Sequence, residues 1–174
     1  MLKKSISMYK ENILSELKNK NAIGTAGDKN TGFNCLTVSW GGIGVLWGKE
    51  VAFVFVRKSR YTYEFLEKSQ SFTLSFLDDC YKDQVFYLGT HSGRVEDKVK
   101  NAGLSYTYDP DYDGAYIKEA SYCFKMKKLY EISLPWEKLP KDIIEKFYKD
   151  GDEHTMFICE IKQFLVSEEY DELH

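Results

Sequence analysis

Short runs of β-branched and aromatic residues recur along the chain and constrain its fold more than any other feature. The clearest are residues 51–56 (VAFVFV) and residues 71–76 (SFTLSF), and residues 154–170 (HTMFICEIKQFLVSEEY) predict one long closing strand. Runs of this composition are typical of β-strands. The unbroken apolar character of residues 51–56 further predicts a strand that is buried on both faces.

Other segments complete a mainly β pattern. Strands are predicted at residues 21–27 and 35–40, and residues 114–134 alternate over a span long enough for two or three antiparallel strands. The glycine-rich segments 27–34 and 41–50 predict a turn and a loop. Short helices are expected at residues 8–19, 59–69 (with Ser59 as N-cap), 81–93, 95–103 and 139–152. Because short, closely connected strands outnumber the helices, the pattern favours a β-barrel with helical insertions over a doubly wound parallel sheet.

The chain is predicted to form one domain, residues 1–174, with a core at about 20–168 after the N-terminal helix at 8–19. Its 24 basic and 27 acidic residues give a net charge of −3, which supplies no basic excess for a nucleic-acid partner. No apolar stretch suits a membrane span or a signal peptide, so we expect no membrane association and a cytoplasmic location.

Metal binding is not expected either. Cys35, Cys80, Cys123 and Cys159 form no CxxC motif, and the chain has three histidines. The cysteines are therefore interpreted as reduced, mostly buried thiols.

Residues 34–40 (NCLTVSW), followed by a glycine-rich segment, are the first candidate site. Strand alternation would place Asn34, Leu36, Val38 and Trp40 on one face and Cys35, Thr37 and Ser39 on the other. A strand edge with hydroxyls, backbone groups and a terminal Trp suits a planar heteroaromatic ligand. An ordinary barrel strand with one apolar and one mixed face is the alternative explanation.

Three further segments carry polar or charged side chains at predicted element boundaries. At the junction of strand 51–56 and the next helix lie Arg57, Ser59, Arg60, Tyr61 and Thr62, where helix N–H groups, guanidinium groups and hydroxyls can bind a phosphate. A second anion contact is possible at Ser92, Gly93, Arg94 and Lys98, with Lys98 one turn after Arg94. His154 precedes the last strand and can titrate near neutral pH. A capped helix and solvated surface charges are the alternatives for these segments.

Together these segments resemble the flavin reductase-like family of FMN-binding split barrels, especially its flavoredoxin-like branch. The resemblance spans residues 20–165 and is carried by residues 34–40, 46–47, 54–62, 72–76, 92–98, 103–104 and the Gly151–His154 segment. It implies a six-stranded Greek-key split β-barrel that forms a homodimer with FMN near the subunit interface. It also implies that Asn34 to Trp40 line the isoalloxazine and ribityl chain, and that residues 57–62 and 92–98 surround the phosphate.

The resemblance further implies a function. His154 is similar to a histidine that lies where flavin and nicotinamide meet in the reductases, although Glu153 is inserted before it here. The leading hypothesis is an NAD(P)H-dependent flavin reductase or flavoredoxin-like electron transfer protein, in which the cofactor carries the chemistry. The alternatives are a non-catalytic flavin- or haem-binding carrier and an interaction module with a decayed site.

Overall fold

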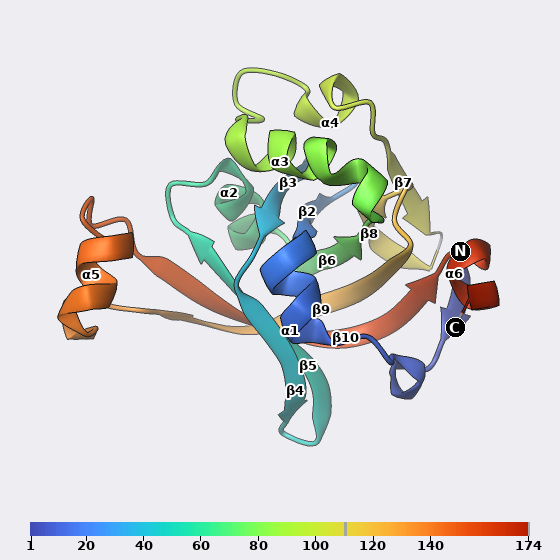
Figure 1. The fold of residues 1–174 in the computed structure, drawn as a ribbon, viewed down its shortest axis with the longest axis horizontal. Coiled ribbons are helices and arrows are strands. Elements are labelled where there is room, and N and C mark those ends of the chain that lie inside the picture. Colours follow the sequence, from blue (N-terminus) through green and yellow to red (C-terminus); the bar gives the residue numbers. More distant parts are fainter. Residues whose placement is uncertain (110, 174) are drawn as a thin grey trace.

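An antiparallel sheet forms the body of the protein in the computed structural model, which describes residues 1–109 and 111–173. Across these residues the sheet has eight strands in the order β3-β2-β6-β9-β10-β5-β4, with β1 paired to β10 (Figure 1). Its strands are β1 (Leu2–Lys4), β2 (Ala22–Asp28), β3 (Gly32–Val38), β4 (Gly41–Leu46), β5 (Lys49–Arg57), β6 (Ser71–Phe76), β9 (Tyr122–Ser133) and β10 (His154–Val166). The strands β7 (Tyr106–Asp109) and β8 (Tyr112–Ile117) form a separate pair.

The helices are short and lie around the sheet. They are α1 (Ile13–Ser15), which continues as the π-helical turn η2 (Glu16–Lys20), α2 (Tyr61–Lys68), α3 (Lys82–Thr90), α4 (Lys98–Asn101), α5 (Lys141–Phe147) and α6 (Glu168–Leu173). The 3₁₀ turns are η1 (Ile6–Met8), η3 (Asp79–Tyr81) and η4 (Trp136–Lys138). In Figure 1, α2, α3 and α4 lie near β2 and β3, whereas α5 stands at the tip of an arm built by β9 and β10. No helix in the described part of the chain is long and apolar enough to cross a membrane.

Two apolar clusters position the strand that bears the candidate site. The larger cluster fills the barrel and includes the fully buried Phe72, Phe124 and Phe157. The second lies between β3 and the helices α3 and α4, and it contains Cys35, Leu88 and other buried side chains. Because β3 contributes to both clusters, its backbone is fixed on two sides.

The mainly β class with short helical insertions is confirmed, and strands form where the runs at 51–56 and 71–76 predicted them. The closing strand predicted at 154–170 forms as β10 but ends at Val166, because residues 168–170 belong to α6. The expected loop at 41–50 is wrong, because residues 41–46 pair with β5 as strand β4. Trp47 and Gly48 have φ values of 54° and 69°, which is the backbone of a two-residue type I′ hairpin turn. Glycines at 41, 42 and 44 concealed this strand, and β1 was also not expected. The sheet is therefore wider than the six strands that the resemblance implies.

Three further expectations need correction. The N-terminal helix begins at Ile13 instead of residue 8, because the Asn12 side chain caps it by accepting bonds from the N–H groups of Leu14 and Ser15. Ser59 does not cap α2, whose N-cap is Arg60 and has no side-chain cap bond. Strand β5 is buried on both faces at Val51 and Ala52, but from Phe53 onward it is fully buried on one face only.

The burial of β5 alternates from Phe53 to Arg57. Val54 and Val56 are fully buried, whereas Phe53 and Phe55 on the opposite face are half-buried. No element of the described chain covers this second face completely.

Candidate functional site

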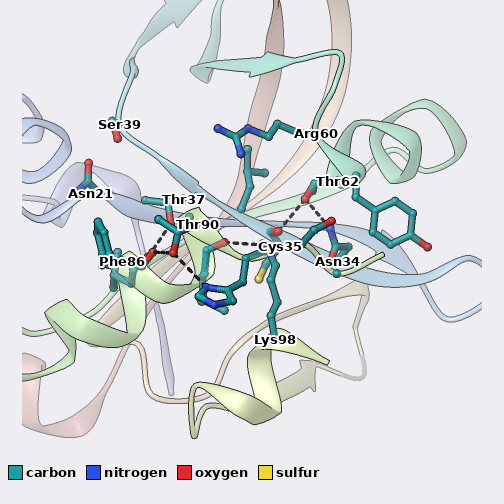
Figure 2. Close-up of a pocket in the computed structure, with 18 of the residues that line it drawn as sticks. Asn21, Asn34, Cys35, Thr37, Ser39, Arg60, Thr62, Phe86, Thr90 and Lys98 are labelled. Atoms are coloured by element: carbon teal, nitrogen blue, oxygen red, sulfur yellow. Dashed lines mark hydrogen bonds between the residues drawn. The ribbon is translucent and has the colours of Figure 1, made fainter. Parts of the chain in front are cut away.

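A pocket of about 670 Å³ lies between β3, the N-terminus of α2 and the helix α3 (Figure 2). Its volume is in the range of small-molecule and cofactor sites. From β3 the pocket is lined by Asn34, Cys35, Leu36 and Thr37, and Ser39 follows at the end of the strand. The strand predicted to carry a planar ligand is therefore one wall of the largest pocket described.

The charge of the pocket differs from that of the whole chain. Its described lining includes Lys20, Arg60, Lys82 and Lys98 and contains no Asp or Glu. The lining is therefore positively charged, although the chain as a whole carries a net charge of −3. Such a wall attracts an anionic ligand.

The N-terminus of α2 is tied to β3 by a buried hydrogen-bond relay. The hydroxyl of Thr62 donates to the carbonyl oxygen of Cys35 at 2.8 Å and accepts a bond from Nδ2 of Asn34 at 2.8 Å. The sequence predicted that this hydroxyl would donate to a phosphate, but its single proton is already used. Thr62 therefore positions the first turn of α2, where backbone N–H groups have no intrahelical partner.

Arg60 is the N-cap residue of α2 and lines the pocket, and its guanidinium extends from the start of the helix toward Ser39 (Figure 2). It is exposed, and none of the described residues forms a hydrogen bond or ion pair with its guanidinium. Its donors are therefore available to a ligand.

Lys98 also lines the larger pocket. Its buried ammonium group donates to the carbonyl oxygens of Leu88 at 2.7 Å and His91 at 3.1 Å, which leaves a third donor unused. Burial lowers the pKa of Lys98, and the positive charge of Arg60 also lowers it. An anion between the two cations would favour the charged form of Lys98.

A smaller pocket of about 230 Å³ adjoins the first and shares Leu36, Thr37, Ser39 and Arg60 with it. Its other walls are Trp40, Phe55, Arg57, Phe147 and His154. The ring of Trp40 lies 4.8 Å from that of His154 and 5.1 Å from that of Phe147, measured between centroids. The far end of β3 therefore opens onto an aromatic chamber.

His154 is buried in this chamber and is electrically neutral at pH 7. Its Nδ1 lies 2.8 Å from the hydroxyl of Tyr148, and the roles of donor and acceptor depend on the tautomer. Burial lowers the pKa of His154 to about 4, assisted by the positive charges of Arg57 and Arg60 and opposed by Asp152. A neutral imidazole can hydrogen-bond to a ligand without adding charge.

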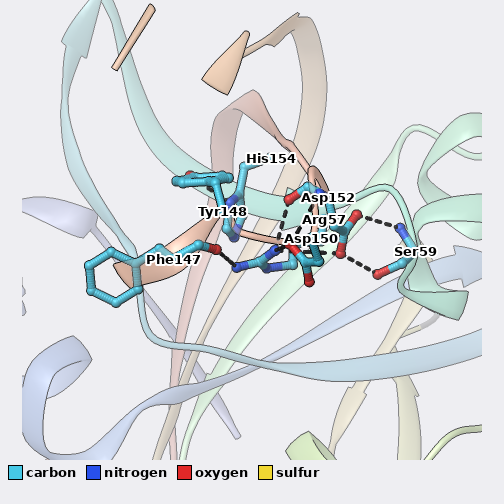
Figure 3. Close-up of polar contacts among 7 residues, drawn as sticks. All are labelled: Arg57, Ser59, Phe147, Tyr148, Asp150, Asp152 and His154. Carbon is cyan, nitrogen blue, oxygen red and sulfur yellow. Dashed lines mark hydrogen bonds and ion pairs between the residues drawn. The ribbon is translucent and has the colours of Figure 1, made fainter. Parts of the chain in front are cut away.

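Arg57 binds the segment between α5 and β10 through hydrogen bonds and ion pairs (Figure 3). Its guanidinium donates to the carbonyl oxygens of Asp152 at 2.8 Å and Phe147 at 2.6 Å, and it lies 3.5 Å and 3.6 Å from the carboxylates of Asp150 and Asp152. Ser59 joins the same cluster, because its hydroxyl donates to the Asp152 carboxylate at 2.6 Å. The donors of Arg57, expected near a phosphate, are occupied in holding the aromatic chamber together.

Most of the predicted site residues meet at these two pockets. The larger is lined by Asn34, Cys35, Leu36, Thr37, Ser39, Ser59, Arg60, Tyr61, Thr62, Ser92, Gly93 and Lys98. The smaller adds Trp40, Arg57 and His154.

Val38 and Arg94 line neither pocket. Val38 is 2% exposed in the main core. Arg94 lies 4.6 Å above the ring of Tyr61 and pairs with Glu64. It does not share a helix face with Lys98, because α4 begins only at Lys98.

Helix α3 and the segment after α1 are walls that the sequence did not identify. Phe86 on α3 is 71% exposed at the pocket, and Asn21 also lines it. Gly89 lies so close to β3 that a Cβ atom there would be 2.8 Å from Oγ1 of Thr37. An apolar side chain on the outer face of an amphipathic helix was the available signal for α3. For Asn21 the signal was weaker, an Asn at the end of a helical pattern.

The geometry described above can be compared with known proteins. The family model described as "Flavin reductase like domain" matches residues 14–173. No curated protein matches the sequence.

Among solved structures, the chain is similar to flavoredoxin of Desulfovibrio vulgaris (Miyazaki F), with 24% identity, a TM-score of 0.69, and coverage of 97% of this chain and 78% of that one. It is also similar to flavoredoxin from Methanosarcina acetivorans, with 20% identity, a TM-score of 0.66, and coverage of 86% and 69%. Nitrilotriacetate monooxygenase component B from Bacillus cereus shares 16% identity, with a TM-score of 0.67 and coverage of 97% and 83%. These similarities confirm the predicted split β-barrel fold.

Proposed function

Because the chain belongs to the flavin reductase-like family, we propose that it binds FMN in the pocket along β3 and exchanges electrons through it. Membership confirms the resemblance inferred from the motifs and supports a flavin-related function. Two solved relatives are named as flavoredoxins, and another as an FMN-binding protein from Thermus thermophilus.

The basic lining of the larger pocket is the observation that carries this proposal. Arg60, the third donor of Lys98 and the first turn of α2 all line this pocket, and together they suit the dianionic phosphate of FMN at the end nearest α2. Gly93 closes that end against Asn34 and Tyr61, so a side chain at this position would collide with Asn34. The residues present therefore fit a phosphate-bearing ligand.

The strand supports the remainder of the ligand. A strand advances roughly 16 Å from Asn34 to Ser39, and Ser39 also lines the chamber of Trp40 and His154. A flat ring placed along this strand would have backbone groups at its edge and aromatic side chains beside it. The chemistry that FMN supplies when bound is acceptance of a hydride and its transfer onward as electrons.

We further propose that NADH or NADPH donates the hydride from the side of the aromatic chamber. The neutral imidazole of His154 would contact the nicotinamide there without attracting a proton. The Arg57 cluster would hold in place the α5–β10 segment, which carries Phe147 and His154.

The absorption spectrum of the purified protein, with chromatographic identification of any released flavin, tests the cofactor. Bound FMN with NAD(P)H oxidation is the expected result. FMN without nucleotide oxidation would indicate a carrier, and a protein with no affinity for added FMN would contradict the proposal.

Replacing Arg60 by Ala tests the phosphate end. Loss of charge-assisted bonds to phosphate is expected to cost about 1.5–3 kcal/mol, which raises the Kd for FMN roughly ten- to a hundredfold. Fluorescence quenching of FMN measures this change. Lys58→Ala is the matched control. This substitution also removes one positive charge, but Lys58 pairs with Glu153 outside the pocket. Equal Kd values for the two variants would argue against a phosphate at Arg60.

We also propose a homodimer that uses the second face of β5. Phe55 pairs across the sheet with Met156, which in turn pairs with Ile132, so the three side chains form a row on this face. Phe55 and Met156 are half-buried and Ile132 is 46% exposed. A second copy covering this row would also approach the aromatic chamber, since Phe55 lines it.

A further inference from the structure

Asn21 has a backbone conformation that is otherwise reserved for glycine. Its φ and ψ are 65° and 159°. Among the described residues only Asn21 and Trp47 combine a side chain with a positive φ. Trp47 occupies a hairpin turn, where a positive φ is expected, whereas Asn21 is in no such turn. Residues in this region cluster at functional sites, where the surrounding structure maintains the strain.

The elements on both sides of Asn21 hold it in place. Its N–H donates to the carbonyl oxygen of Glu16 at 2.9 Å, which closes the π-helical turn η2. Glu16 is itself buried and accepts a hydrogen bond from the hydroxyl of Tyr122 at 2.8 Å. Directly after Asn21, the fully buried Ala22 begins β2. π-Helical turns are rare in proteins overall, and those that occur are often located at functional sites.

The side chain of Asn21 faces the larger pocket. Figure 2 shows its carboxamide beside Ser39, at the end of the pocket away from Asn34. Neither side chain forms a hydrogen bond with another residue in the described part of the chain. Most other polar side chains of the lining already have protein partners, as with Thr37, which donates to the carbonyl oxygen of Val85 at 2.8 Å. The strained backbone therefore presents an uncommitted carboxamide to the ligand.

We propose that Asn21 is a specificity-determining residue that hydrogen-bonds the pyrimidine edge of the isoalloxazine ring. This inference rests on the proposed function. A carboxamide offers one acceptor oxygen and two N–H donors. The pyrimidine edge presents carbonyl oxygens on either side of the N3–H group, which match these donors and this acceptor. A site built for such bonds rejects an analogue that lacks one of them.

Asn21→Gly separates a structural from a ligand-binding role, because glycine removes both the strain and the carboxamide. The apoprotein variant is expected to melt at the same temperature as the wild type or higher. Its Kd for FMN is expected to rise about tenfold, as for the loss of one or two hydrogen bonds. Trp47→Gly is the matched control, since it relieves the other positive φ outside the pocket and should leave the Kd unchanged.

N3-methyl-FMN tests which edge of the ring is bound. The wild type should bind this analogue more weakly than FMN, whereas Asn21→Gly should discriminate less between the two. Asn21→Asp is a second variant of nearly the same size, and it should also lose affinity because a carboxylate has no donor for the carbonyl oxygens. Wild-type affinity for FMN in both variants would overturn the role of Asn21. A wild type that binds no FMN would instead overturn the proposed function itself.

Discussion

At the scale of single residues, the site depends on which side chains still have free hydrogen-bond donors. Arg57 and Arg60 are three positions apart and have the same chemistry. The guanidinium of Arg57 is occupied by two carbonyl oxygens and two carboxylates, whereas that of Arg60 faces the pocket without a described partner. The difference arises because the α5–β10 segment folds back onto the end of β5. No local pattern in the sequence distinguishes the two residues.

His154 makes the stability of the protein depend on pH in a defined window. Its pKa is lowered to about 4 in the folded protein, against an ordinary value of 6.5. Between pH 6.5 and about 4, His154 binds a proton in the unfolded chain but stays unprotonated in the folded protein. Stability from this group is therefore fully present above pH 6.5 and is lost as pH falls toward 4, by about 3 kcal/mol at most. Urea unfolding of the wild type and His154→Gln between pH 7 and 4 measures the effect.

The His154→Gln variant should lose less stability across this window than the wild type. His91 and His174 remain in both proteins, so their contributions cancel in the comparison. Parallel stability curves for the two proteins would show that His154 titrates normally.

At the scale of elements, the pocket exists because α3 docks closely on β3. The hydroxyl of Thr37 donates to the carbonyl oxygen of Val85 in α3, and Gly89 allows the helix to approach this side chain. Val85 and Leu88 are buried beneath the helix, while Phe86 remains on the pocket side. A helix at 81–93 is predicted from the sequence and forms as α3, but its docking surface is not predicted, because close approach depends on the strand that the helix meets.

Gly89→Ala is expected to weaken this docking. Alanine favours a helix over glycine by about 1 kcal/mol, but overpacking against the β-branched Thr37 costs about 1–3 kcal/mol. We expect a net loss of about 1 kcal/mol in the free energy of unfolding, measured with urea. Gly42→Ala is the control, since a Cβ there meets nothing within 4 Å. A more stable Gly89→Ala protein would mean that α3 can shift without cost.

At the scale of the whole molecule, the second face of β5 is an apolar surface that the single chain leaves partly exposed. The run at 51–56 predicted burial on both faces, yet Phe53 and Phe55 remain half-buried. The row continues onto β10 and β9 as far as Tyr130 and Ile132, which are 55% and 46% exposed. An apolar row of this kind is typical of an interaction surface.

Ile132→Glu tests whether a second copy covers this surface. In a dimer the substitution would bury an unpaired carboxylate, so we expect the variant to elute as a monomer while the wild type is a dimer. Multi-angle light scattering measures the mass directly. Leu173→Glu is the matched control, because Leu173 is 75% exposed on α6, away from the row. A wild-type monomer at high concentration would contradict the homodimer.

The sequence by itself determined the mainly β class, most of the strands and the residue types available at the site. Runs of aromatic and β-branched residues specify strands locally, and the motifs at 34–40, 57–62 and 92–98 supply many of the residues that line the two pockets. Tertiary structure alone decided the partner of each polar group. Arg57 bonds the α5–β10 segment, Thr62 bonds the carbonyl oxygen of Cys35, and Asn21 faces the pocket. Propensity and periodicity act over a few neighbouring residues, whereas a hydrogen bond between distant segments depends on how the whole chain packs.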